Sequence, residues 1–99
     1  MSDYPSEAEL EQIREWPLGD DDGWFRFVRS VWWMPDWGWS ESSVNDAFDR
    51  PVRRYHVSTG GWSGNEDIID AMRHSWIWAM TWQQSRRGGH YIFDVPLPR

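Results

Sequence analysis

The sequence has 99 residues, no cysteine and a formal net charge of −6, so disulfides, thiolate zinc sites and cysteine nucleophiles are excluded. A single domain over residues 1–99 accounts for this length, and such a domain buries roughly 60–65% of the surface of the unfolded chain. No apolar run approaches the ~20 residues of a membrane span, and the N-terminus is acidic where a signal peptide is basic, so we expect a soluble, cytoplasmic protein with no membrane partner.

The negative charge lies at one end of the sequence. Residues 1–22 contain eight acidic residues against Arg14 alone, a balance of −7, whereas residues 23–99 contain eight acidic residues and nine arginines, a balance of +1. We call residues 1–22 the acidic arm. Within it, Ser6 and Glu9 form a capping box that predicts a short helix to about Glu15. A narrow apolar stripe holds this helix, and we expect the arm to be peripheral to the domain.

The remaining elements follow from periodicity and from glycine and proline. A second helix is predicted from about Gly23 to Met34, and residues 36–52 have no clear period and are expected to be mostly loop. Alternation predicts a strand at 53–58 and another at 90–95, with a long helix between them to about Ser85. The sequence therefore predicts an α+β domain of three helices on a small two- or three-stranded sheet, in the order α-α-β-α-β.

The turn "TGGWSGN" before the long helix has the composition of a phosphate-binding loop but not its pattern. The chain has no lysine, which excludes a Walker loop, and Thr59 stands where the first glycine of a dinucleotide fingerprint belongs. Ser63 and Glu66 instead form a second capping box, which predicts that Ser63 caps the helix. The free helix N-terminus remains a possible anion site, for which the candidate residues are Gly60, Gly61, Ser63 and Gly64.

Catalytic and metal-binding patterns are missing from the sequence. His56, His74 and His90 lie on three different predicted elements, without the spacing of a zinc-binding motif. Serine or threonine nucleophiles could approach a histidine in the fold, yet there is no G-x-S-x-G. We expect neither a catalytic site nor a bound metal or cofactor. The candidate nucleophiles are Ser58, Thr59 and Ser63.

The ten tryptophans are the other notable feature. On a continuous helix from residue 63 to about 85, Trp76 and Met80 share the apolar stripe, whereas Trp78 falls on the polar side near His74. On the second helix, Trp33 falls outside the apolar face near Arg29. These off-stripe tryptophans either lie exposed at an interface or are covered by the 35–52 loop as a second small core. The interface candidates are Trp33, Trp37, Trp39, Trp78, Arg29 and His74.

Three segments resemble a known group of sequences: "MPDWGW" (34–39), "YHVSTGGWSGNEDII" (55–69) and "SRRGGHYIFDV" (85–95). They are similar to small uncharacterised proteins encoded by actinobacteriophages. The resemblance implies a phage origin and a place in the cytoplasm of an infected bacterial host, and it implies no activity or functional residue.

These observations favour a small acidic, tryptophan-rich protein that binds a host or phage protein, with a homo-oligomer as a further possibility. The alternative is a module that binds single-stranded nucleic acid or a small ligand through the TGGWSGN turn and surface aromatics. A net charge of −6 disfavours nucleic acid.

Overall fold

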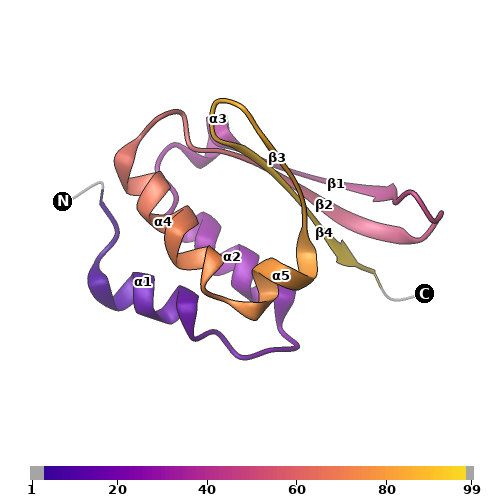
Figure 1. The fold of residues 1–99 in the computed structure, drawn as a ribbon, viewed down its shortest axis with the longest axis horizontal. Coiled ribbons are helices and arrows are strands. Elements are labelled where there is room, and N and C mark those ends of the chain that lie inside the picture. The colour runs from indigo at the N-terminus through magenta and orange to yellow at the C-terminus, as the bar shows by residue number, and fades with distance from the viewer. Residues whose placement is uncertain (1–3, 98–99) are drawn as a thin grey trace.

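Helices cover one face of an antiparallel sheet in the computed structural model, which describes residues 4–97 (Figure 1). The α+β class predicted from the sequence is confirmed, but residues 4–97 form five helices rather than three, and the sheet has four strands in the order β1-β2-β4-β3 rather than two or three. The elements are α1 (Glu7–Arg14), α2 (Asp21–Val31), α3 (Pro35–Gly38), β1 (Trp39–Asn45), β2 (Pro51–Ser58), α4 (Ser63–Arg73), α5 (Trp76–Thr81), β3 (Trp82–Arg86) and β4 (His90–Pro96).

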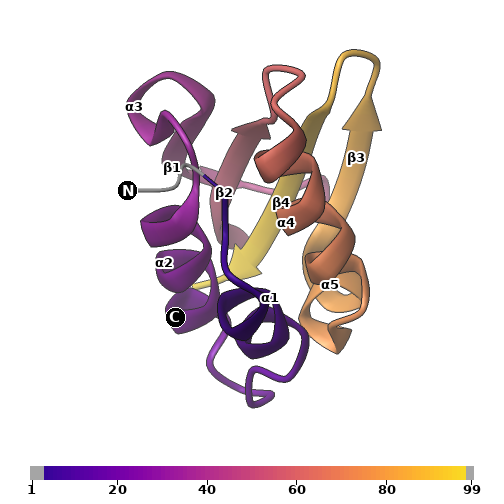
Figure 2. The same ribbon diagram turned by 90° about the vertical axis from the view of Figure 1, so that its left-hand side faces the viewer.

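The two central strands, β2 and β4, determine which side chains face the helices. Tyr55 pairs with Phe93 in the register, and both point into the core. The intervening residues point to the opposite face, which the helices leave uncovered (Figure 2). We call this the open face of the sheet. Phe25 of α2 stacks on Tyr55 with ring centroids 4.1 Å apart and contacts Phe93 at 5.3 Å, so α2 is held against the middle of the sheet.

A polar contact completes the junction between α2 and the sheet. The Tyr55 hydroxyl donates a hydrogen bond of 3.0 Å to Asp22, which also accepts one of 3.1 Å from Arg53. Burial raises the pKa of the Tyr55 hydroxyl above its ordinary value of 10.0, so the group remains a neutral donor at physiological pH.

The region predicted to be loop, residues 36–52, contains α3 and the edge strand β1 instead. β1 pairs with β2 along its whole length, from Trp39 opposite Val57 to Asn45 opposite Pro51. Its side chains after Trp39 are mostly exposed, so it lacks the alternation of apolar and polar residues by which a half-buried strand is recognised. Backbone pairing, which the side-chain pattern does not reveal, makes this segment a strand.

The single long helix predicted after residue 63 is wrong. α4 ends at Arg73, and Ser75 starts a new helix by accepting a hydrogen bond of 3.1 Å from the Ile77 amide. This break rotates α5 relative to the predicted stripe. Trp76 and Met80, predicted to lie in the core, are exposed at 73% and 64%, while Ile77 is fully buried. Residues 82–86 then continue as β3 rather than as helix.

The two predicted capping boxes have different outcomes. The Ser6 box is confirmed, because its hydroxyl accepts from the Glu9 amide at 3.1 Å and Glu9 accepts from the Ser6 amide at 2.8 Å. The Ser63 box is wrong: Trp62 is the N-cap of α4 and makes no side-chain capping bond. Ser63 is the first helical residue, and its hydroxyl lies 3.0 Å from that of Tyr4.

The acidic arm belongs more closely to the domain than we expected from its sequence. Ile13 of α1 is fully buried and Leu10 is also part of the core. The backbone carbonyl of Ile13 accepts a buried hydrogen bond of 2.9 Å from the Trp24 indole. The arm's expected peripheral position is therefore corrected for α1, whose apolar side anchors it to α2 and α4.

The difference between the two serines can be measured. Ser6→Ala removes a side-chain cap and should lower the free energy of unfolding by about 0.5–2 kcal/mol. Ser63→Ala removes only an exposed hydroxyl contact and should change it by less than about 0.5 kcal/mol. Urea unfolding followed by tryptophan fluorescence gives both values. An equal loss for both variants would contradict the assignment of the caps.

The role of α1 in the core can be tested separately. Ile13→Ala deletes a fully buried side chain and should lower the free energy of unfolding by about 2–5 kcal/mol. Glu11→Ala, on the exposed side of the same helix, is the matched control and should stay within about 0.5 kcal/mol of the parent. If both variants unfold at the same urea concentration as the parent, α1 is peripheral after all.

Candidate functional site

A partly exposed aromatic cluster lies where α2, α3 and the turn before α4 meet. It surrounds an open hollow of about 510 Å³ lined by Trp33, Met34, Pro35, Asp36 and Trp37. Trp37 is 67% exposed and Met34 is 52% exposed. Trp62 stacks on Trp33 from the side of α4, with ring centroids 4.4 Å apart. We call Trp33, Met34, Trp37 and Trp62 the aromatic surface.

The backbone of the aromatic surface is held by a buried amide. The side chain of Asn65 accepts from the Trp33 amide at 2.9 Å and donates to the Trp33 carbonyl at 3.1 Å. This double hydrogen bond clamps the end of α2 to α4. The chain then passes through Met34, whose φ of 56° is left-handed, and Pro35 starts α3. The short helix projects Trp37 outward.

The glycine-rich turn shapes this surface, and its glycines have two different roles. A Cβ on Gly60 would lie 2.9 Å from the ring of Trp37, and one on Gly64 would lie 2.9 Å from the Trp62 indole nitrogen. Gly61 has nothing within 4 Å, but its φ of +74° requires glycine. Indole rings therefore occupy the space beside Gly60 and Gly64, and binding of an anion at this turn stays a prediction.

The other two predicted interface tryptophans do not join Trp33 and Trp37. Trp39 is only 6% exposed and belongs to the core, so its assignment to an interface is corrected. Trp78 is half-buried against Tyr91 and Phe93, under the guanidinium of Arg73.

Of the two polar neighbours predicted for these tryptophans, one lies beside the aromatic surface. Arg29 makes an exposed ion pair of 3.6 Å with Asp36, which lines the hollow next to Trp37. His74 is the exposed C-cap residue of α4, at the break that ends the predicted long helix.

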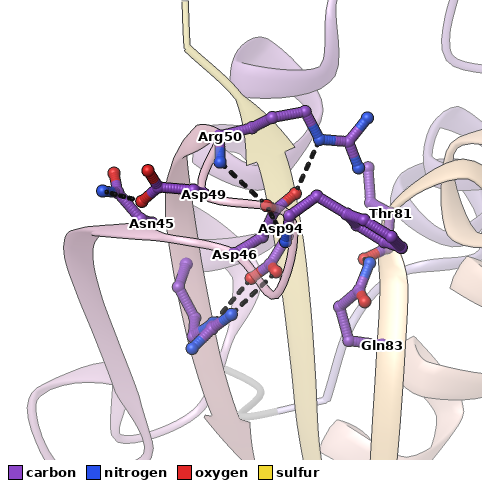
Figure 3. Close-up of polar contacts among 9 residues, drawn as sticks. Asn45, Asp46, Asp49, Arg50, Thr81, Gln83 and Asp94 are labelled. Carbon is purple, nitrogen blue, oxygen red and sulfur yellow. Dashed lines mark hydrogen bonds and ion pairs between the residues drawn. The ribbon is translucent and has the colours of Figure 1, made fainter.

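The open face of the sheet carries polar residues that the sequence patterns did not single out. Arg54 donates two hydrogen bonds to Asp94, of 2.7 and 2.9 Å, across β2 and β4. The bond to Asp94 raises the pKa of the Arg54 guanidinium. Beside this pair lies a cavity of about 250 Å³ between the β1–β2 turn and α5 (Figure 3). Its lining residues are Asp46, Arg50, Val52, Met80, Gln83, Asp94 and Pro96.

The charges at this cavity are already paired. Asp46 accepts hydrogen bonds of 2.9 Å from the amides of Phe48 and Arg50 and one of 3.0 Å from the Arg50 side chain (Figure 3). The bond from the Arg50 amide is the largest of the effects that lower the pKa of Asp46. These bonds close the β1–β2 turn, and we assign the cluster a structural role.

Two histidines also meet on the open face. His90 Nδ1 lies 2.6 Å from the Ser58 hydroxyl, and His90 Nε2 lies 3.4 Å from His56 Nδ1. Burial, the nearby His56 and Arg86 all lower the pKa of His90 below its ordinary value of 6.5. Sequence reasoning named Ser58 and His56 as candidates but could not bring them to His90, because only the pairing of β2 with β4 does so. Thr59, a further candidate nucleophile from the sequence, is buried.

Comparisons with protein-family models, with curated proteins and with solved structures found no match to this chain. Among residues 4–97, none of the helices has the length and apolar character needed to cross a membrane. The same residues contain no cluster of three or more His, Asp or Glu side chains placed to hold a metal ion.

The lowered pKa of His90 predicts how stability depends on pH. The unfolded chain binds a proton at His90 more readily than the folded chain does, so protonation favours unfolding. Stability should therefore fall as the pH is lowered through about 6.5, and His90→Gln should remove part of this dependence. Urea unfolding across this pH range, with NMR titration of the His90 ring, measures both effects. A His90 ring that titrates above 6.5 would contradict the prediction.

Proposed function

We propose that this chain is a small protein-interaction protein and that the aromatic surface binds its partner. The observation that carries the proposal is the exposure of Trp37 and Met34 around the hollow at α3. Tryptophan is among the side chains most enriched at the energetic centres of protein interfaces, where it is buried on binding. Methionine adapts its shape to different apolar partners. The proposal involves no catalytic step.

The backbone at this surface supports the proposal. Met34 is held in a left-handed conformation that costs a non-glycine residue about 1–3 kcal/mol. The Asn65 clamp and the contact of Trp37 with Gly60 hold the segment in place. Because the surface is ordered before binding, a partner that contacts it loses less conformational entropy than one that must order a flexible loop.

The charged side chains around the aromatic surface indicate which kind of partner protein could bind there. α4 presents exposed Glu66 and Asp67 beyond Trp62, and the exposed Asp36 carboxylate beside Trp37 is paired with Arg29. The acidic arm adds further negative charge along α1, which packs against α4. We infer a partner protein that presents an apolar side chain flanked by arginine or lysine. Such complementarity accelerates association and weakens as salt is added.

Because of the resemblance to actinobacteriophage proteins, we propose that the partner is a host or phage protein in the cytoplasm of the infected bacterium. Two of the three resembling segments meet at the aromatic surface, because Trp37 comes from "MPDWGW" and Gly60 from "YHVSTGGWSGNEDII". The segments that carry the resemblance therefore contribute residues to the surface that we propose binds the partner.

The test uses two tryptophans that are exposed to similar extents. Proteins captured from the bacterial host by the parent chain are identified by mass spectrometry, and the affinity of the purified partner is then measured. Trp37→Ala should weaken binding about 30-fold or more, the effect of a hot-spot residue. Trp76→Ala, on α5, should leave the affinity unchanged.

Two controls separate binding from folding and from self-association. Thermal melts should show that both variants remain folded at the assay temperature. Light scattering across a concentration series detects a homo-oligomer, in which case the partner is a second copy of the chain. A partner that binds the parent and Trp37→Ala with equal affinity would exclude the aromatic surface as its site.

A further inference from the structure

The pairing of β2 with β4 brings His56 and His90 together on the open face. Ser58 lies directly opposite His90 in the register, and His56 lies opposite Ile92. His56 and His90 are therefore diagonal neighbours, and both side chains point away from the helices. Their rings face each other through His56 Nδ1 and His90 Nε2, which are 3.4 Å apart.

This separation is long for a hydrogen bond between two ring nitrogens, since N–H donors usually lie about 2.9–3.0 Å from their acceptors. The same distance also matches a different arrangement. Two imidazole nitrogens that bind one tetrahedral metal ion at about 2.0–2.1 Å lie about 3.3–3.4 Å from each other. The two rings are thus spaced as a pair of ligands to a shared ion.

Ser58 is placed to form a hydrogen bond with the nitrogen of His90 that would not bind the metal. A histidine that binds metal through one nitrogen usually donates the N–H of the other to an oxygen, which fixes the ring and its tautomer. The Ser58 hydroxyl lies 2.6 Å from His90 Nδ1 and can accept that N–H. His90 Nε2 then carries its lone pair toward His56.

We propose that His56 and His90 bind one divalent transition-metal ion of the Zn²⁺, Ni²⁺ or Cu²⁺ type, with water completing the coordination. Imidazole ligands favour these ions over Mg²⁺ and Ca²⁺, which prefer oxygen. Among residues 4–97 no third His, Asp or Glu joins the pair, so the site has two protein ligands and open positions. Arg86 pairs with His90 across β3 and β4, and its positive charge opposes the bound cation.

The proposal is tested on the full chain, without reference to any partner protein. Zn²⁺ is titrated into the protein by calorimetry, and the histidine side chains are followed by NMR. We expect one equivalent of Zn²⁺ to bind with shifts at His56 and His90, and Mg²⁺ to cause neither heat nor shifts. His56→Gln and His90→Gln should each abolish this binding. His74→Gln is the matched control and should preserve it, because His74 is exposed on α4.

Two further variants distinguish metal binding from a structural pair of histidines. Ser58→Ala should weaken Zn²⁺ binding about tenfold or more by releasing the His90 ring. Arg86→Gln should strengthen it, because it removes a neighbouring positive charge, whereas a structural pair gives no reason for that gain. Circular dichroism confirms that each variant is folded. The proposal is overturned if the parent shows no saturable Zn²⁺ binding, or if His56→Gln binds as the parent does.

Discussion

The antiparallel register between β2 and β4 is the constraint on which the rest of the structure depends. It places Tyr55 and Phe93 side by side under Phe25, and on the opposite face it aligns Arg54 with Asp94. Because side chains alternate along a strand, a slip of one residue would move the whole core set to the open face. The apolar core and the bidentate ion pair both favour the same register, and each excludes that slip.

The aromatic surface and the histidine pair lie near the same end of the sheet. Gly38, which follows Trp37, packs so closely on the end of β2 that a Cβ there would lie 2.6 Å from the Ser58 carbonyl. The Thr59 amide then donates to the Gly89 carbonyl at 3.0 Å, which fixes the turn beside His90. A protein docked on Trp37 and an ion held by the histidines would therefore approach the same turn. The two proposals remain independent, since each rests on its own side chains.

Much of the distribution of tryptophans is structural. Trp24 and Trp39 are core residues, Trp62 and Trp33 stack on each other, and only some of the ten indoles reach solvent. Trp37 is exposed on the short helix α3, and Gly60 lies against one edge of its ring. The aromatic surface thus combines the stacked pair of Trp33 and Trp62 with the exposed ring of Trp37.

The sequence by itself determined the α+β class, the Ser6 cap and the strands containing Tyr55 and Phe93, because each depends on local patterns of a few residues. Only the tertiary structure decided the rest. β1 is a strand because β2 pairs with it, and Trp76 is exposed because the break at Ser75 rotates α5. The approach of His56 to His90, 34 positions apart in the chain, follows from strand register. A pattern within one segment carries no information about which segment will lie beside it.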